Sequence, residues 1–256
     1  MHPIVDFYFF ELAAYSAWVR LGAVCGMSAA YLYLRWQSRR AAALSTFLDG
    51  AVIVFVAGAL GARAYHVAMR WDYYAARPDE IAQFDLGGLA IRGALLAGLL
   101  ALIAYARGRR LPLGKIFDAT AIGLCIGQTL GWVGALLHGA NFGAVSDSQF
   151  ALDLPDLHGL IEPRFPLQHA EIILFAGLFV ALVILALRQA QPGTLLVVYA
   201  LIASLSNFAL GFFRGDETLL VGTWRIDQIF DAVCAAFAIA LLFYRQLRNV
   251  GKVGIS

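Results

Sequence analysis

The sequence predicts an all-α integral membrane protein: a bundle of about seven transmembrane helices, with the N-terminus outside and the C-terminus cytoplasmic. Its composition is 61% apolar and only 14% charged, whereas soluble domains are typically about 45–50% apolar and about 25% charged. Apolar stretches also follow one another with short connections, and basic residues are distributed unevenly among those connections. We therefore expect a single polytopic transmembrane domain over residues 1–256.

Each apolar stretch has about 20 residues, which is the length that an α-helix needs to cross the hydrocarbon core. The predicted spans are 13–34, 49–68, 88–106, 118–138, 169–187, 195–213 and 226–244. Two of the connections are longer than the others, at 70–86 and 139–168. We expect both of these to lie on the outer side, because each follows an even-numbered span of a chain that starts outside.

Lysine and arginine residues determine the predicted orientation. With the N-terminus outside, 11 of the 19 basic residues fall on the cytoplasmic side, 6 fall on the outer side and 2 lie within spans. A basic excess in cytoplasmic connections is the orienting signal of membrane proteins. The formal net charge of only +2 gives no reason to expect a nucleic-acid partner.

Polar side chains gather near the predicted outer ends of the second to seventh spans. A charge in the hydrocarbon core costs roughly 2.5–3.5 kcal/mol on insertion scales, so such a group tends to face a partner or a wet cavity. Arginine suits an anionic lipid headgroup because its planar guanidinium binds phosphate oxygens in bidentate fashion. We therefore predict a headgroup site that opens outward. Its candidates are Arg63, Arg92, Gln128, His138, Asn141, Gln168, His169, Glu171, Asn207, Arg214, Arg225 and Asp227.

Several of these candidates also have a purely structural interpretation. Interfacial arginines extend to water or lipid phosphate, and His138 is either a general base or a hydrogen-bonded packing group. Asp49 and Asp118 are expected to cap the starts of their own helices. No His, Cys, Asp or Glu cluster has metal-ligand spacing, so we expect no metal and no cofactor.

Taken in order, several segments resemble the prolipoprotein diacylglyceryl transferase family of bacterial inner membranes. The similarity extends from residue 49 to about residue 228. It rests on a GxR motif ending at Arg63, a GG-x-x-x-x-G segment ending at Gly93, the signature region 117–143, RFPLQHAE at 164–171 and FALGFFRGDE at 208–217. The family residues retained here are Arg63, Gln128, Gly131, Gly134, Gly139, Gly143, Pro166, Gln168, Glu171, Arg214 and Gln228.

The departures from the family pattern concentrate where chemistry is expected. Trp132, Ala135 and Ala140 stand where the family signature has Arg, Asn and Glu. Arg92 and Phe165 replace histidines, His66 and Ala170 replace tyrosines, and Asn207 replaces an arginine. The scaffold is therefore retained better than the catalytic set.

The resemblance implies transfer of a diacylglyceryl group from phosphatidylglycerol to the lipobox cysteine of a preprolipoprotein. A multi-pass protein of the bacterial inner membrane would perform it at the outer leaflet, with the bilayer and the preprolipoprotein signal peptide as partners. The reaction needs cations for the phosphate leaving group and a base to generate the thiolate. The predicted catalytic residues are Arg214, His138 and Arg92, with His66 as a second candidate base. The predicted substrate-binding residues are Arg63, Gln128, Gln168, Glu171, Asn141 and Gly143.

Two alternatives to this function stay open. The missing signature residues are compatible with a non-catalytic lipid-binding or scaffold relative that kept the bundle and lost the reaction. A lipid-linked transferase with an altered substrate is the other alternative, because the surviving Arg, Gln and Glu side chains indicate that some ligand is still bound.

Overall fold

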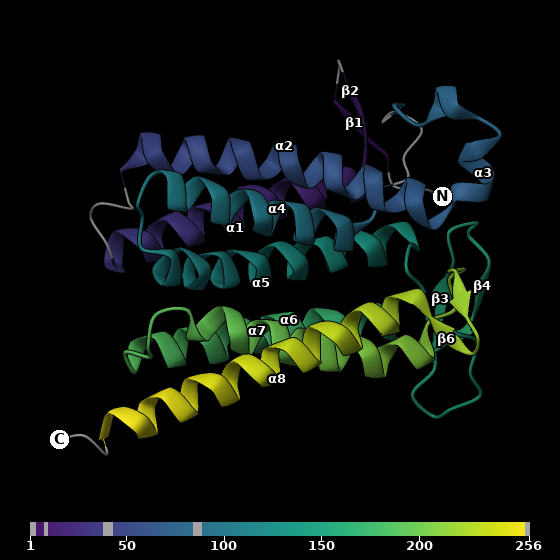
Figure 1. Cartoon of the computed structure of the whole chain (residues 1–256). Coiled ribbons are helices and arrows are strands. Elements are labelled where there is room, and N and C mark those ends of the chain that lie inside the picture. Colours follow the sequence, from purple (N-terminus) through teal and green to yellow (C-terminus); the bar gives the residue numbers. More distant parts are fainter. Residues whose placement is uncertain (1–3, 8–9, 38–42, 84–88, 254–256) are drawn as a thin grey trace. The chain divides into compact units, whose positions relative to one another are not determined.

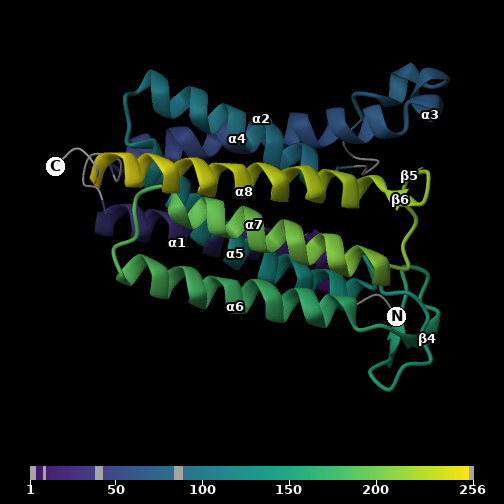
Figure 2. The ribbon, with the colours of Figure 1, turned by 60° about the horizontal axis from the view of Figure 1, so that its bottom comes forward.

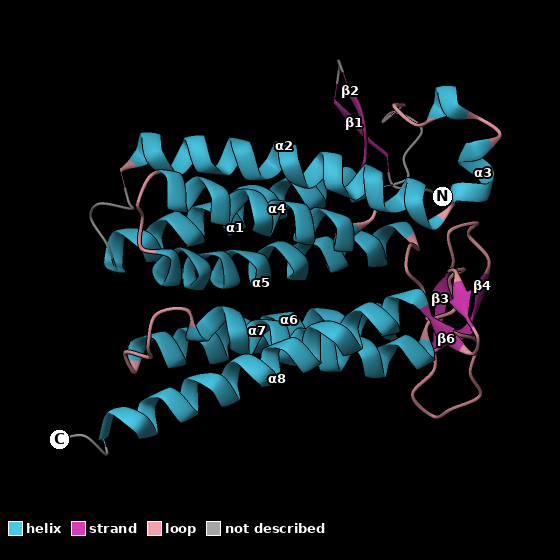
Figure 3. Ribbon diagram, viewed as in Figure 1, coloured by secondary structure: helices cyan, strands magenta, loops and turns pink. Residues whose placement is uncertain are grey.

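A computed structural model describes residues 4–7, 10–37, 43–83 and 89–253 of the chain, and the chain is mainly helical (Figure 3). The prediction of seven spans is confirmed: within those ranges, seven helices are long and apolar enough to cross a membrane. They are α1 (Ala14–Gln37), α2 (Leu44–Met69), α4 (Ile91–Gly108), α5 (Leu113–His138), α6 (Leu167–Leu187), α7 (Thr194–Leu210) and α8 (Ile226–Val253). Gly88, where the third predicted span begins, and the basic residues Arg39 and Arg40 lie outside the described ranges.

The chain divides into two compact units. The smaller unit, Leu34–Ile116, contains α2, α4, the short helix α3 (Trp71–Ala75) and the 3-10 turn η1 (Pro78–Glu80). The larger unit, Met1–Tyr33 with Phe117–Ser256, contains most of α1 and α5 together with α6, α7, the 3-10 turn η2 (Gly211–Phe213) and α8.

The segments outside the long helices contain short antiparallel hairpins that the analysis of apolar runs did not predict. Two-stranded pairs form between β1 (Ile4–Phe7) and β2 (Phe10–Ala13), between β3 (Leu152–Pro155) and β4 (Ile161–Arg164), and between β5 (Leu220–Val221) and β6 (Trp224–Arg225). Within the larger unit, β3, β4, β5 and β6 lie at the ends of α6, α7 and α8 that are remote from the C-terminus (Figures 1 and 2). These hairpins therefore extend the bundle beyond its apolar part at one end.

Small residues let α2 and α4 pack closely in the smaller unit. A Cβ atom on Gly61 would lie 2.2 Å from the Ala97 Cβ and 2.6 Å from the Gly93 carbonyl oxygen. The amide of Ala90 also donates to the Ala62 carbonyl across the pair, at 3.2 Å. Such close approach supplies the van der Waals contact that drives helix association in lipid, where apolar burial alone provides no net force.

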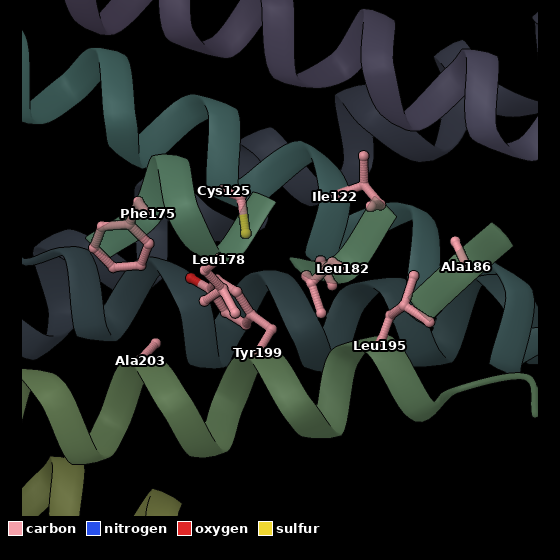
Figure 4. Close-up of a cluster of buried hydrophobic side chains, with 10 residues drawn as sticks. Ile122, Cys125, Phe175, Leu178, Leu182, Ala186, Leu195, Tyr199 and Ala203 are labelled. Carbon is pink, nitrogen blue, oxygen red and sulfur yellow. The ribbon is translucent and has the colours of Figure 1, made fainter. Parts of the chain in front are cut away.

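In the larger unit, α5, α6 and α7 enclose the main buried cluster (Figure 4). Its α6 members recur every three or four residues and so occupy one helix face. They are Phe175, Leu178, Leu182 and Ala186, and they pack with Ala121, Ile122 and Cys125 of α5 and with Leu195, Tyr199 and Ala203 of α7. Cys125 is fully buried, whereas Cys25 and Cys234 are only partly buried.

The prediction that Asp49 and Asp118 cap their own helices is wrong. Both residues lie inside helices that begin five residues earlier, at Leu44 and Leu113. Asp118 instead caps another helix: its carboxylate oxygens accept hydrogen bonds from the amides of Gly193 and Leu195 at the start of α7, at 2.7 and 2.8 Å. Asp49 is exposed and lies 3.5 Å from Arg109.

Replacing Asp118 with alanine is expected to destabilise the protein by about 1–3 kcal/mol. The substitution removes both acceptors and leaves two amides at a buried helix start without partners. Asp49→Ala is the matched control and is expected to change stability by less than about 1 kcal/mol, because it breaks only an exposed ion pair. Thermal unfolding in detergent micelles measures both variants, and equal losses would contradict the assigned cap.

Candidate functional site

The connection after α5 is held between two other segments of the larger unit. The Ala144 amide donates to the Phe213 carbonyl at 2.8 Å, and the Gly215 amide donates to the Phe142 carbonyl at 2.9 Å. On its other side, the Ala144 carbonyl accepts the Phe165 amide at 2.9 Å. The residues after α5, before α6 and after α7 are thereby brought together, although they are far apart in the sequence.

Gly143 is required at the centre of this arrangement. It forms a backbone bridge with Arg214, and a Cβ atom on Gly143 would lie only 2.0 Å from the Phe165 carbonyl oxygen. Asn141, two residues earlier, has a φ of 51°. Asparagine adopts this left-handed conformation more readily than most residues other than glycine. The predicted site residues Asn141 and Gly143 therefore shape the backbone that Arg214 lies against.

Arg214 lies after η2 and is bound on two sides. Its Nε and Nη2 donate to the two carboxylate oxygens of Asp216 at 2.8 and 2.7 Å, and Nη2 also donates to the Asn141 Oδ1 at 3.0 Å. Nη1 donates no hydrogen bond within the part of the chain that the structure describes. Arg214 therefore keeps one end of its guanidinium for an external acceptor.

The charge of Arg214 is secured by its surroundings. Burial on its own lowers the pKa of this guanidinium, but the hydrogen bond to Asp216 and the negative charges of Asp216, Asp227 and Glu171 raise the pKa above its ordinary value. Arg214 is consequently cationic at any pH at which the protein would work.

Asp216 also holds a second arginine, Arg225. The Arg225 guanidinium donates to the Asp216 carbonyl at 3.0 Å and to the Asp216 Oδ1 at 3.2 Å. The Arg225 amide donates to the Gln228 Oε1 at 3.3 Å, and Gln228 Nε2 donates to the Phe208 carbonyl at 3.1 Å. The sequence analysis did not single out Asp216, although side chains two residues apart in an extended segment share a side.

Gln168 and Glu171 occupy the first two turns of α6 and are both buried, at 1% and 2% exposure. Gln168 Nε2 donates to the Ala140 carbonyl at 3.1 Å, beside Asn141. Glu171 lies one turn further along the same face and acts electrostatically on Arg214. These two predicted binding residues thus continue the polar site from Asn141 into the helical bundle.

Gln128 meets a residue that the sequence analysis missed. Its Nε2 donates to the hydroxyl of Tyr199, which joins α5 to α7. Tyr199 is buried and is also acted on electrostatically by Glu171. A tyrosine within an apolar run carries no signal that separates it from a core aromatic, so only the packing of α5 against α7 identifies it.

Two ring contacts involve positions at which a base was expected: His138, the predicted base, and Phe165, which stands where the family pattern has a histidine. His138, the last residue of α5, stacks on Tyr15 with ring centroids 5.6 Å apart. Phe165, where the family pattern has a histidine, stacks on Phe213 at 4.4 Å. An apolar pair therefore occupies a place next to Gly143 where a titratable ring would have been expected.

Arg63 and Arg92 belong to the smaller unit. Arg63 is buried, and its Nε and Nη2 donate to the carbonyls of Ile81 and Glu80 at 3.0 and 2.6 Å. Its guanidinium also lies 5.2 Å from the centre of the Tyr74 ring. Within its own unit Arg63 thus holds the connection between α2 and α4, while Arg92 lies partly buried in the first turn of α4.

The β3–β4 hairpin is stabilised by a buried arginine. Arg164 Nη2 donates to the Asp156 carboxylate at 3.2 Å and to the Glu162 carboxylate at 2.7 Å. Asp156 Oδ1 accepts the amides of His158 and Leu160 at 2.8 and 3.0 Å. Desolvation raises the pKa of the Asp156 carboxyl, but these two amides and the positive charge of Arg164 outweigh it, so the pKa lies below its ordinary value.

This lowered pKa predicts a pH-dependent contribution to stability. A carboxylate with a lowered folded-state pKa stabilises the protein above its unfolded pKa of about 3.9, and the contribution is lost as pH falls through the lower folded value. The difference in melting temperature between the wild type and Asp156→Ala should therefore be full at neutral pH and shrink below about pH 4. A difference independent of pH would contradict the assigned role of the charge.

Comparison with known proteins gives consistent results. The family model for prolipoprotein diacylglyceryl transferase matches residues 3–244. Over 247 residues, the chain is 31% identical to the phosphatidylglycerol–prolipoprotein diacylglyceryl transferase of Bacillus licheniformis, covering 92% of this chain and 88% of the relative. The protein of the same name from Synechococcus elongatus is 32% identical over 87% of this chain and 82% of its own length. The one from Thermosynechococcus vestitus is 33% identical over 73% and 72%.

Proposed function

Since the chain belongs to the prolipoprotein diacylglyceryl transferase family, we propose that it transfers a diacylglyceryl group from phosphatidylglycerol to the lipobox cysteine of a preprolipoprotein. It is a multi-pass membrane protein. We place it in the bacterial inner membrane as one polytopic domain, with the N-terminus outside and the C-terminus in the cytoplasm, as the distribution of basic residues favours.

The observation that carries this proposal is the charge of Arg214 and the way in which its side chain is held. Its guanidinium is cationic, partly buried and held by Asp216 and Asn141, while Nη1 keeps two N–H groups for an external oxygen. Such a preorganised donor is suited to stabilise charge that develops on a phosphate oxygen during reaction.

The reaction needs one bond to form and one to break. The cysteine thiolate attacks the terminal glyceryl carbon of the lipid, and a carbon–sulfur bond replaces the bond between that carbon and the phosphate oxygen. The electron pair of the broken bond leaves with glycerol phosphate. Arg214 stabilises this leaving group, and Arg92 is proposed as a second cation.

His138 is the proposed base that accepts the thiol proton, because a neutral imidazole ring has one nitrogen without a hydrogen that can accept a proton. It ends α5 three residues before Asn141, which contacts Arg214. The remaining predicted residues, Arg63, Gln128, Gln168, Glu171, Asn141 and Gly143, are proposed to bind or position the lipid headgroup.

A second candidate function is lipid binding without catalysis. The stacked pair of Phe165 and Phe213 favours it, because this pair places apolar rings where a titratable group was expected. In that case the Arg214 site would still bind an anionic headgroup but would transfer nothing. A transferase with an altered lipid-linked substrate remains the third candidate.

Purified protein in nanodiscs tests these candidates directly. The protein is supplied with phosphatidylglycerol and a lipobox peptide, and mass spectrometry detects the thioether product. His138→Phe keeps a ring against Tyr15 but removes the ring nitrogens, so it is expected to lower the rate, whereas the exposed His158→Phe should not. Headgroup-dependent binding without product would support the non-catalytic candidate and contradict the transferase. Complementation of a strain depleted of its own transferase tests the same question in cells.

A further inference from the structure

We propose that Asp216 is a positioning residue, which orients Arg214 and Arg225 as a pair of cations for one phosphate group. This inference rests on the proposed function and deepens it, because it names the group that fixes the cationic site and adds Arg225 to it. The phosphate is that of a lipid headgroup or of the glycerol phosphate that the reaction releases.

The first support is the geometry around Arg214. Asp216 engages the Nε and Nη2 edge of the guanidinium with both carboxylate oxygens, at 2.8 and 2.7 Å. Two parallel bonds of this kind fix the plane of an arginine as well as its position. Nη1, on the other side of the group, is therefore held in one direction rather than moving with a flexible side chain.

The second support is that Asp216 binds both arginines, Arg214 and Arg225. Its Oδ1 accepts from both Arg214 and Arg225, and its backbone carbonyl accepts from Arg225 at 3.0 Å. One residue thus sets the separation of two guanidinium groups. An arginine pair without such a common anchor would move apart, because like charges repel.

The third support is the rigidity of the backbone that carries Asp216. Gly215 donates to the Phe142 carbonyl at 2.9 Å, and a Cβ atom on Gly215 would lie 2.7 Å from the Gly143 carbonyl oxygen. Asp216 therefore follows a residue that is packed directly against the backbone of Gly143. Because its backbone is held in place, the Asp216 carboxylate can hold both arginines in fixed positions.

The charges of the three residues fit a phosphate diester. Two guanidinium groups and one carboxylate leave a net charge of one positive unit, which matches the single negative charge of a phosphate diester. The side chains are 15%, 13% and 23% exposed for Arg214, Arg225 and Asp216. They are thus partly withdrawn from water, where electrostatic interactions are stronger, yet still open to a ligand.

The test compares positioning with simple charge neutralisation, because the two predict opposite results. Asp216→Asn removes a negative charge, so a neutralising role predicts that inorganic phosphate binds more tightly. A positioning role predicts weaker binding. The asparagine side chain has an NH2 group in place of one carboxylate oxygen, and this group cannot accept a hydrogen bond from an arginine, so that arginine is no longer held in place. Asp216→Glu keeps the charge but changes the reach, so only positioning predicts a loss for it. Glu217→Gln, an exposed neighbour, is the matched control.

Phosphate binding is measured as the rise in melting temperature of the full chain in phosphatidylcholine nanodiscs, with chloride at equal ionic strength as the reference. We expect the apparent affinity for phosphate to fall at least tenfold in Asp216→Asn and Asp216→Glu and to be unchanged in Glu217→Gln. Unchanged or tighter binding in either Asp216 variant, or no phosphate effect on the wild type, would overturn the inference. If Asp216→Asn does not fold, Asp216→Glu decides.

Nanodiscs that contain phosphatidylglycerol show whether the bound phosphate is that of the lipid headgroup or that of the released glycerol phosphate. They also test the positioning role of Asp216 separately from the transferase activity. If the lipid is the ligand, its presence should raise the melting temperature of the wild type and reduce the further effect of inorganic phosphate, and both effects should be lost in Asp216→Glu. Protection by inorganic phosphate but not by the lipid would assign the site to the released glycerol phosphate. A wild type that shows these effects but forms no thioether would refute the transferase and leave the positioning role standing.

Discussion

Arg214→Ala is expected to lower kcat/KM for diacylglyceryl transfer by about 10²–10³-fold, the loss typical of removing one preorganised donor to a developing anion. The substitution removes the Nη1 donors and leaves Asp216 with one arginine instead of two. Arg214→Lys should fall between the wild type and the alanine variant, since an ammonium keeps the charge but cannot form the two parallel bonds.

Steady-state kinetics with phosphatidylglycerol nanodiscs and a lipobox peptide measures this loss. Arg188→Ala is a suitable control, because Arg188 is an exposed residue at the end of α6 and is expected to keep the wild-type rate. Equal rates for Arg214→Ala and Arg188→Ala would remove the basis of the proposed chemistry.

Gly143→Ala is expected to destabilise the protein by about 3 kcal/mol, at the upper end of typical overpacking costs, and to reduce transfer as well. The added methyl group would lie 2.0 Å from the Phe165 carbonyl oxygen, so either the segment around Gly143 or the segment around Phe165 must move. Either movement disturbs the bridge to Arg214. Stability and activity should therefore fall together.

Gly177→Ala provides the matched control for this substitution. Gly177 lies within α6, and a Cβ atom there meets nothing within 4 Å. Alanine is favoured over glycine in a helix by about 1 kcal/mol, so this variant should be as stable as the wild type or slightly more stable. Chemical unfolding in micelles compares the two, and a Gly143→Ala protein as stable as Gly177→Ala would contradict the described packing.

The helices show where hydropathy suffices and where it fails. The start of the fourth span was predicted at residue 118, but α5 begins at Leu113. Lys115 interrupts the apolar run, yet its ammonium reaches the Gln37 carbonyl at 2.5 Å while its backbone stays helical. Likewise α8 continues to Val253, beyond its apolar part. Hydropathy reports the length in contact with lipid, whereas backbone hydrogen bonds set where a helix ends.

The candidate site was predictable as a set of residue types but not as a set of contacts. Family residues pointed to Gln128, Glu171 and Arg214, and the structure gives each of them a polar neighbour. Asp216 and Tyr199 were missed because the spacing of Asp216 from Arg214 does not by itself separate an anchoring carboxylate from a solvated one, and the local sequence of Tyr199 does not separate a site phenol from a core ring.

The number and approximate place of the spans followed from the sequence by itself, because crossing the hydrocarbon core requires about 20 apolar residues that satisfy their own backbone hydrogen bonds. That requirement concerns consecutive residues only, so it can be recognised in the sequence of each span by itself. Only the tertiary structure decided which polar groups meet, as with Arg214 and Asn141, 73 residues apart, or Asp118 and Gly193, 75 residues apart. Such pairs depend on how helices and hairpins pack, and packing is a property of distant segments together.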